Sequence, residues 1–277
     1  MLEITDVGYS YGRGDAAHRA GRVAGRVIDG INLQVARGEL VAIAGPSGCG
    51  KSTLLRCIAG LLHPSQGTIV VNGTVVREVP DGLAVVFQDY SRSLYPWLTV
   101  RDNVALPLHK TQPRRAVRRE TAQRALAAVG LADAAHRYPW QLSGGMQQRC
   151  AIARAIACDP VLLLMDEPFG SLDAQTREDL EDLILGLRRD REITILLVTH
   201  DIDEAVYTSD RVVILSGPPG RIRAELTVAL PKPRDQIATR QLPAFVRLRA
   251  EASRLIRGQA AVTARQAPAA DPAASTA

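Results

Sequence analysis

The stretch VAIAGPSGCGKSTLLRCIAG, residues 41–60, decides the fold of this chain. It opens with an apolar run at 41–44, continues through the glycine-rich segment GPSGCGKS at 45–52, and ends with helical spacing. A short and wholly apolar run is typical of a strand that is covered on both faces. The pattern G-x-x-x-x-G-K-[S/T] between such a strand and a helix is typical of a phosphate-binding loop. The stretch therefore predicts a strand, a phosphate-binding loop and a helix in succession.

The residue types in this loop suit a nucleoside triphosphate such as ATP. Glycines let the backbone curl so that successive N–H groups face the α- and β-phosphates. Lys51 brings positive charge to the β- and γ-phosphates, and the hydroxyl of Ser52 is placed to ligate Mg²⁺. The predicted nucleotide contacts cover the loop and the start of the helix: Gly45, Pro46, Ser47, Gly48, Cys49, Gly50, Lys51, Ser52 and Thr53.

Other parts of the chain extend the same architecture. The runs VLLLMD at 161–166 and TILLVT at 194–199 have the character of buried strands. Helical patterns occur at 51–61, 173–188 and 202–208, and short strands separated by turn residues at 2–11, 31–36 and 68–76. Buried strands that alternate with helices predict an α/β fold of the P-loop NTPase kind. We expect a mostly parallel sheet with an N-terminal antiparallel β part.

The middle of the chain interrupts this alternation. Residues 92–155 carry helical patterns and no convincing buried strand, so they predict an α-helical subdomain inserted in an ATPase domain of residues 1–230. Residues 13–26 lack periodicity and are expected to form an exposed loop. Residues 231–277 are expected to hold a C-terminal helix and a disordered tail rich in Ala and Pro. The apolar face of that helix carries Phe245, Leu248, Ala252 and Leu255.

Polar residues at strand ends supply the remaining chemistry of phosphoryl transfer. Asp166 ends a buried run and is the predicted magnesium ligand, while Glu167, which points differently, is the predicted general base for water. His200 ends another run, where it could bind the γ-phosphate, although a lone His at a strand end is more often structural. Gln88 follows an apolar run and could reach both metal and water.

A second phosphate-binding pattern lies about a hundred residues after the first. LSGGMQQR at 142–149 places a serine and two glycines before a predicted helix, where free N–H groups and the helix dipole favour an anion. With GPSGCGKST, Phe87-Gln88, LLLMDEP, SLDA at 171–174 and Thr199–Asp201, this set resembles the nucleotide-binding subunit of an ATP-binding cassette (ABC) transporter over residues 2–230.

The resemblance implies why one chain carries two phosphate-binding stretches. In this family ATP lies between two cassettes packed head to tail, and the signature of one caps the γ-phosphate held by the other. Ser143, Gly144, Gly145 and Gln147 would then complete the site of a second copy, in a homodimer with two ATP sites. The resemblance further implies that Asp173 lies at the dimer interface and that Tyr11 stacks on adenine.

A docking surface for a membrane partner is expected just after Gln88. Large apolar residues stand in a loop there: Leu94, Tyr95, Trp97 and Leu98. Exposed apolar groups of this size favour a protein partner. The resemblance makes that partner the coupling helix of a permease, although for Trp97 a place in a small core under the helical subdomain is an equally good interpretation.

Local phrases are similar to importer ATPases of the nitrate/sulfonate/taurine group, above all LSGPPGRIRAELTVALPKPRD at 215–235. This similarity implies uptake of a small anion, with a solute-binding protein that reaches the chain through the permease. Importers of thiamine-precursor pyrimidines stay open as an alternative, because specificity lies in other subunits. A non-transport cassette is less favoured, since residues 53–141 show no sustained heptad pattern. An exporter ATPase is also less favoured, because the chain has no fused membrane helices.

Composition sets limits on partners and location. The net charge is +5, and the cluster RRAVRR at 114–119 is interpreted as a solvated helix face, so no nucleic-acid partner is expected. Four cysteines without metal-like spacing are interpreted as reduced thiols. No run approaches about 18 apolar residues and no signal peptide is recognised. These features predict a soluble, intracellular chain, and the resemblance implies that it is a peripheral protein at the cytoplasmic face of the membrane.

Overall fold

The strand that precedes the glycine-rich loop, β3 (Leu40–Ala44), lies inside a six-stranded sheet. The computed structural model describes residues 1–12 and 25–258. The strand order is β10-β9-β3-β8-β7-β6, and every neighbouring pair is parallel except β9 and β10. The other strands are β6 (Leu83–Val86), β7 (Leu162–Asp166), β8 (Thr194–Val198), β9 (Arg211–Leu215) and β10 (Ile222–Thr227).

A second, antiparallel sheet is built from the N-terminal part of the chain. Its order is β2-β1-β4-β5, and Ile4 of β1 pairs with Leu33 on one side and Ile69 on the other. The predicted α/β fold with an antiparallel N-terminal part is therefore confirmed. The bounds of these strands are β1 (Leu2–Ser10), β2 (Arg26–Val35), β4 (Gln66–Val71) and β5 (Thr74–Val75).

The strands of the large sheet are buried on both faces because alternate side chains enter different cores. Leu162 and Leu164 of β7 pack with α2 (Lys51–Ile58) and the antiparallel sheet. Leu163 and Met165 pack on the opposite face, against helices. Each core covers one face of the sheet, so every position of the strand must be apolar until its last residue.

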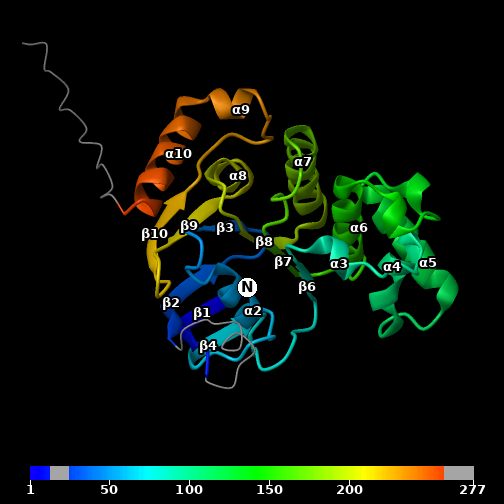
Figure 1. Cartoon of the computed structure of the whole chain (residues 1–277), viewed down its shortest axis with the longest axis horizontal. Coiled ribbons are helices and arrows are strands. Elements are labelled where there is room, and N and C mark those ends of the chain that lie inside the picture. Colours follow the sequence, from blue (N-terminus) through cyan, green and yellow to red (C-terminus); the bar gives the residue numbers. More distant parts are fainter. Residues whose placement is uncertain (13–24, 259–277) are drawn as a thin grey trace, which may run out of the picture.

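Between β6 and β7 the described chain forms only helices, which Figure 1 shows in green beside the sheet. They share a core with the sheet and are held by the buried Asn103, whose amide bonds the carbonyls of Tyr95, Leu98 and Thr99. The α-helices are α3 (Tyr90–Ser93), α4 (Val100–Ala105), α5 (Arg115–Ala128) and α6 (Gly144–Ile156). Short 3₁₀ turns join them at η1 (Leu106–His109), η2 (Ala132–Ala134) and η3 (Pro139–Gln141).

The remaining helices pack against the large sheet, the first of them over β7 and β8 and the others near β9. They are α7 (Ala174–Arg191), α8 (Ile202–Thr208), α9 (Ala238–Gln241) and α10 (Pro243–Ile256). On α10, Phe245, Ala252 and Leu255 are buried against α8 and β9, while Leu248 is partly buried. Figure 1 shows α10 lying along the outer strands of the large sheet, so the C-terminal part of the described chain covers a core.

Several bounds differ from expectation for physical reasons. The strand expected at 31–36 begins at Arg26, because Tyr9 and Ser10 of β1 pair with Ile28 and Arg26. The strand expected at 68–76 is broken by a turn in which Asn72 and Gly73 adopt positive φ. β6 and β9 were not anticipated as strands. Residues 13–24 of the expected loop and the tail from 259 lie outside the described residues, and the division into domains stays a prediction.

Candidate nucleotide site

The glycine-rich loop opens toward solvent on one side and packs closely on the other. Gly48 and Gly50 adopt φ of 80° and 94°, which favour glycine. A Cβ at Gly48 would meet nothing within 4 Å, whereas a Cβ at Gly50 would lie 2.5 Å from Cγ2 of Ile28. The backbone around Gly48 is therefore open to solvent and can cradle a ligand, whereas the backbone at Gly50 packs against β2.

Lys51 curls back over this cradle. Its Nζ donates to the carbonyls of Gly45 at 2.8 Å and Pro46 at 3.1 Å, and its side chain is almost wholly buried. No ion pair of the described residues includes this ammonium group. A buried cation in a glycine-rich loop at the start of a helix is suited to a polyanion such as the phosphates of ATP.

The carboxyl end of β7 brings Asp166 to the start of α2. Oγ of Ser52 donates to Oδ1 of Asp166 at 3.0 Å, and burial raises the pKa of this carboxyl. Among the described residues no cluster of three or more His, Cys, Asp or Glu could hold a metal by itself. Mg²⁺ is commonly held by one or two protein oxygens together with substrate phosphates, so the hydroxyl and carboxylate here fit that ion.

Three polar side chains converge beyond this pair. Oε2 of Glu167 lies 3.0 Å from Nε2 of Gln88 and 3.2 Å from Nδ1 of His200. They follow the carboxyl ends of β7, β6 and β8, which lie side by side in the sheet. Glu167 adopts φ of 46°, an uncommon conformation for a side chain other than glycine, and its N–H donates to the carbonyl of Val198 at 2.8 Å.

A pocket of about 530 Å³ lies over the loop, and of these three side chains only Glu167 is among its lining residues. Tyr11 lines it, with its hydroxyl 3.4 Å from Oγ1 of Thr53 and its ring edge-on to Tyr9. Sequence reasoning did not single out four other lining residues: Gly25, Arg26, Val27 and Pro218. Pro218 lies in the segment 215–235, which the sequence analysis used only to identify the transporter group. Its consecutive prolines and glycine indicate a turn, and that turn was the available sequence signal.

That turn supports the back of the phosphate loop. A Cβ at Gly220 would lie 2.0 Å from the carbonyl oxygen of Cys49, and Gly220 exchanges backbone bonds with Val27 and Asp29. Next to it, Arg221 pairs with Asp29, which also pairs with Arg26. The loop between β9 and β10 therefore fixes both the phosphate loop and a wall of the pocket.

The signature residues lie away from this pocket, and none is among the described residues that line it. Ser143 caps α6, with its Oγ accepting from N–H of Met146 at 3.3 Å, and both Ser143 and Gly144 are exposed. The amide of Gln147 is used within the chain, donating to the carbonyls of Pro139 and Leu142. The N-terminus of α6 thus presents an open face.

The loop of Asp173 touches this helix. Asp173 caps α7 by accepting from N–H of Thr176 at 3.0 Å and from its hydroxyl at 2.7 Å. A Cβ at Gly145 would lie only 2.4 Å from Cγ2 of Thr176. Glycine at position 145 therefore allows the first turns of α6 and α7 to approach closely.

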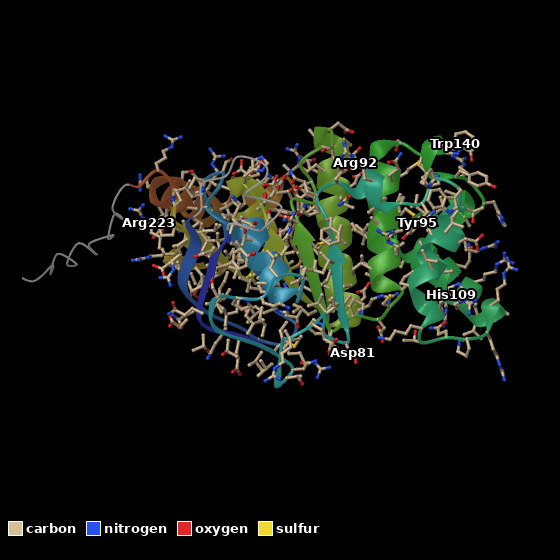
Figure 2. All side chains as sticks on the ribbon, turned by 60° about the horizontal axis from the view of Figure 1, so that its bottom comes forward. Asp81, Arg92, Tyr95, His109, Trp140 and Arg223 are labelled. Atoms are coloured by element: carbon tan, nitrogen blue, oxygen red, sulfur yellow. The ribbon has the colours of Figure 1, made fainter. Side chains whose placement is uncertain are left out.

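The expected docking surface needs one correction. Leu94 is buried in the core under the helices, at 4% exposure, whereas Tyr95 and Trp97 are 41% and 70% exposed and Leu98 is intermediate. The backbone at Leu94 is extended and N–H of Tyr95 is held by Asn103, so the two neighbouring side chains point in opposite directions. Figure 2 shows Tyr95 on the helical side of the molecule, far from Arg223.

The fold and these side chains define a P-loop nucleotide-hydrolysing enzyme. The profile described as ABC transporter matches residues 28–170, and the chain belongs to this family, as an ATP-binding subunit that hydrolyses ATP. Two curated relatives come from Synechococcus elongatus. A nitrate import ATP-binding protein is 42% identical over 81% of this chain and 82% of its own length. A bicarbonate transport ATP-binding protein is 44% identical over 80% of this chain and 81% of its own length.

A solved structure supports the same assignment. The dimeric structure of a bacterial ABC transporter cassette is 33% identical, with a TM-score of 0.71, over 82% of this chain and 99% of that one. The similarity to ATP-binding subunits of the nitrate group is therefore confirmed. Among the described residues no helix has the length and apolar character needed to span a membrane.

Replacing Gly220 by alanine is expected to displace the phosphate loop, because the new Cβ would overlap the carbonyl of Cys49. We expect a loss of about 1–3 kcal/mol in the free energy of unfolding, together with weaker ATP binding. Urea titration and fluorescent-nucleotide titration measure the two effects. Gly186→Ala is the matched control, since a Cβ on that helical residue meets nothing within 4 Å. Equal behaviour of the two variants would contradict the supporting role of Gly220.

Proposed function

We propose that two copies of this chain pack head to tail and share two ATP sites. The observation that carries the proposal is the separation of the two phosphate-binding stretches: the pocket at the loop takes no lining residue from the signature, and the capped N-terminus of α6 is exposed. Ser143, Gly144 and Gly145 would cover the phosphates held by the other copy, with Asp173 at the interface. The dimeric state of the related cassette supports this arrangement.

Within each site the chain's residues divide the work of hydrolysis. Lys51 and the loop N–H groups bind the phosphates, and the ring of Tyr11 is the stacking surface for adenine. Ser52, Asp166 and Gln88 would hold Mg²⁺, which neutralises phosphate charge. Oε2 of Glu167 is held by Gln88 and His200, which leaves Oε1 to take a proton from the attacking water. Nε2 of His200 is then available to the γ-phosphate.

Glu167→Gln removes the proposed base and retains the shape of the side chain. We expect hydrolysis to fall by about 100-fold or more, while ATP stays bound and the protein accumulates as a closed dimer. A phosphate-release assay gives the rate, and size exclusion with light scattering, with ATP in EDTA, gives the mass.

The control adds Ser143→Arg to the same protein. A long, positively charged side chain at the exposed N-cap of α6 should prevent the two copies from packing together, and it should not contact the nucleotide pocket of its own chain. The double variant is expected to bind ATP as a monomer. Normal hydrolysis by Glu167→Gln would exclude Glu167 as the base. An ATP-driven dimer of the double variant would exclude the signature as the cap.

We further propose that the chain works as a peripheral subunit at the cytoplasmic face, where Tyr95, Trp97 and Leu98 dock a permease. Tyr95 and Trp97 form a tilted ring pair with centroids 5.3 Å apart, and Trp97 keeps 70% of its surface exposed. A large exposed aromatic pair on a loop anchored by Asn103 favours a protein partner.

Trp97→Ala is expected to weaken permease binding and to leave the ATPase rate of the isolated chain unchanged, because Trp97 is not among the residues that line the pocket. Co-purification with a co-expressed permease subunit measures the first effect. Trp140→Ala is the control, since Trp140 is equally exposed, at 70%, on another turn. Undiminished co-purification of the Trp97 variant would refute this docking surface.

The transported solute is proposed to be a small anion of the nitrate, bicarbonate or sulfonate and taurine type. The two relatives that import nitrate and bicarbonate support this class. The solute-binding protein and the permease select the solute, and this chain supplies ATP hydrolysis.

Cells that carry the complete transporter should therefore take up labelled nitrate, bicarbonate or taurine, and lose that uptake with Lys51→Ala in this chain. Uptake of a thiamine-precursor pyrimidine in place of all three anions would overturn the proposed class. The Lys51→Ala cells control for uptake by other routes.

A further inference from the structure

A buried carboxylate lies between the loop of His200 and the first turn of α7. Glu204 of α8 is only 5% exposed, and its Oε2 accepts a hydrogen bond of 2.6 Å from Oγ1 of Thr199. The same Thr199 oxygen accepts from N–H of Asp201 at 3.0 Å. Thr199 and Asp201 flank His200, the residue that contacts Glu167, so the Glu204 carboxylate holds one side of His200 directly and the other side through the Thr199 hydroxyl.

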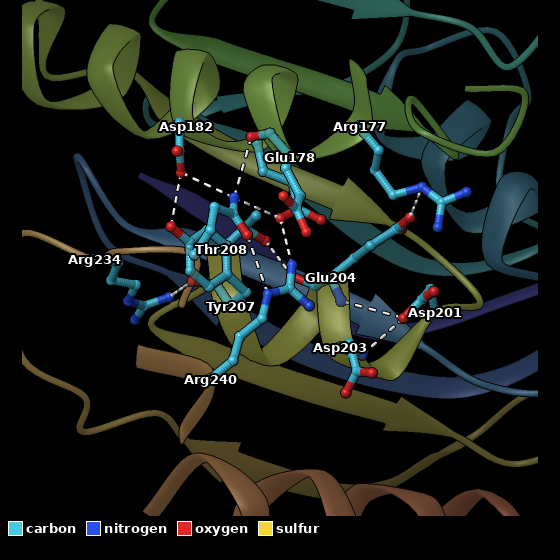
Figure 3. A network of polar contacts seen from close by, with 12 residues as sticks. Arg177, Glu178, Asp182, Asp201, Asp203, Glu204, Tyr207, Thr208, Arg234 and Arg240 are labelled. Carbon is cyan, nitrogen blue, oxygen red and sulfur yellow. Dashed lines mark hydrogen bonds and ion pairs between the residues drawn. The ribbon is translucent and has the colours of Figure 1, made fainter. Parts of the chain in front are cut away.

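The other oxygen of Glu204 faces α7. Its Oε1 lies 3.5 Å from Nε of Arg177, and an Nη atom of Arg177 donates to the carbonyl of Leu172 at 3.1 Å. Leu172 directly precedes Asp173, the cap of α7. Figure 3 shows Arg177 reaching across to Glu204, with Asp201 at the start of the same helix. A continuous polar path therefore runs from Thr199 through Glu204 and Arg177 to Leu172.

We propose that Glu204 and Arg177 are positioning residues for ATP hydrolysis, which keep the loop of His200 and the loop of Asp173 at a fixed separation. The inference rests on the proposed function, in which His200 faces the nucleotide of its own copy and Asp173 faces the second copy. Through this pair, the occupancy of one ATP site sets the position of a loop that belongs to the other.

The two residues should act as one unit. Burial is the main reason that the pKa of the Glu204 carboxyl is raised to about 7; the charges of Asp201 and Glu181 also raise it, whereas Thr199 and Arg177 lower it. Loss of Arg177 therefore removes the positive partner of the ion pair and also favours the uncharged, protonated form of Glu204. Replacing either residue should break the same path, so the second replacement should add little to the first.

The neighbouring Glu181 provides a matched control. It is fully buried on α7 and its Oε2 pairs with Arg240 at 2.8 Å and with Gln236 at 3.1 Å, both from the C-terminal segment. Figure 3 shows Arg240 beside this part of the network. Glu181 has no hydrogen bond to Thr199 or Leu172 among the described residues, so Glu181→Gln removes a buried charge near Glu204 without cutting the path.

The first test compares steady-state hydrolysis by Glu204→Gln, Arg177→Gln, the double variant and Glu181→Gln. We expect kcat to fall about 10- to 100-fold in the first three, by nearly equal amounts, with KM for ATP changed little. Arg177→Lys, which keeps the positive charge, should recover part of kcat. Thermal unfolding of each protein separates a loss of folded protein from a loss of positioning.

The second test uses the Glu167→Gln protein as it assembles with ATP. Adding Glu204→Gln should weaken the ATP-driven dimer about 5- to 100-fold, whereas adding Glu181→Gln should not. When Ser143→Arg is also present, so that the protein stays monomeric, the ATP affinity should be the same with Glu204→Gln as with Glu181→Gln.

The outcomes separate the two proposals. If Glu167→Gln alone fails to dimerise, the shared-site proposal fails, and the kcat comparison still decides whether Glu204 positions the site. If Glu204→Gln and Arg177→Gln retain the kcat of Glu181→Gln, or if their effects on kcat simply add, the positioning role is overturned.

Discussion

The parallel register of β3, β8 and β7 is the constraint on which the site depends. Asp166 pairs with Val198, and Val198 pairs with Ile43, so these strands end at one edge of the sheet. That edge brings a carboxylate against Ser52 and places Glu167 next to His200. A shift of one strand by one residue would turn its polar end into the apolar core, which makes this register costly to change. Burial of the strands on both faces thus fixes the positions of Asp166, Glu167 and His200 at their carboxyl ends.

Local pattern was enough to predict the central parts of this molecule. The loop at 45–52 and the runs before Asp166 and His200 are continuous in sequence, so each element could be predicted from its own residues. The antiparallel β part was likewise predictable, although its bounds were not, because strand ends depend on partners elsewhere in the chain. The roles assigned to individual site residues stay predictions, since geometry alone shows proximity and not chemistry.

Other features could not be predicted because they arise from contacts between distant segments. Leu94 looks exposed in a polar loop, but its burial depends on Asn103 holding the backbone of Tyr95. Gly220 matters because a turn more than 150 residues downstream lies against Cys49. Arg177 and Glu204 are ordinary helix residues in sequence, and only the packing of α7 beside α8 makes them partners. Sequence periodicity describes one element at a time, and these contacts join several.

The close approach of Gly145 to Thr176 has a mechanical consequence. Because no Cβ separates them, the start of α6 lies directly against the start of α7, so neither can shift far toward the other. Ser143 and Asp173, which cap these two helices, are therefore carried by helix starts that adjoin one another. In the proposed dimer, a tilt of this part of one subunit would therefore change the contacts of both residues with the second copy.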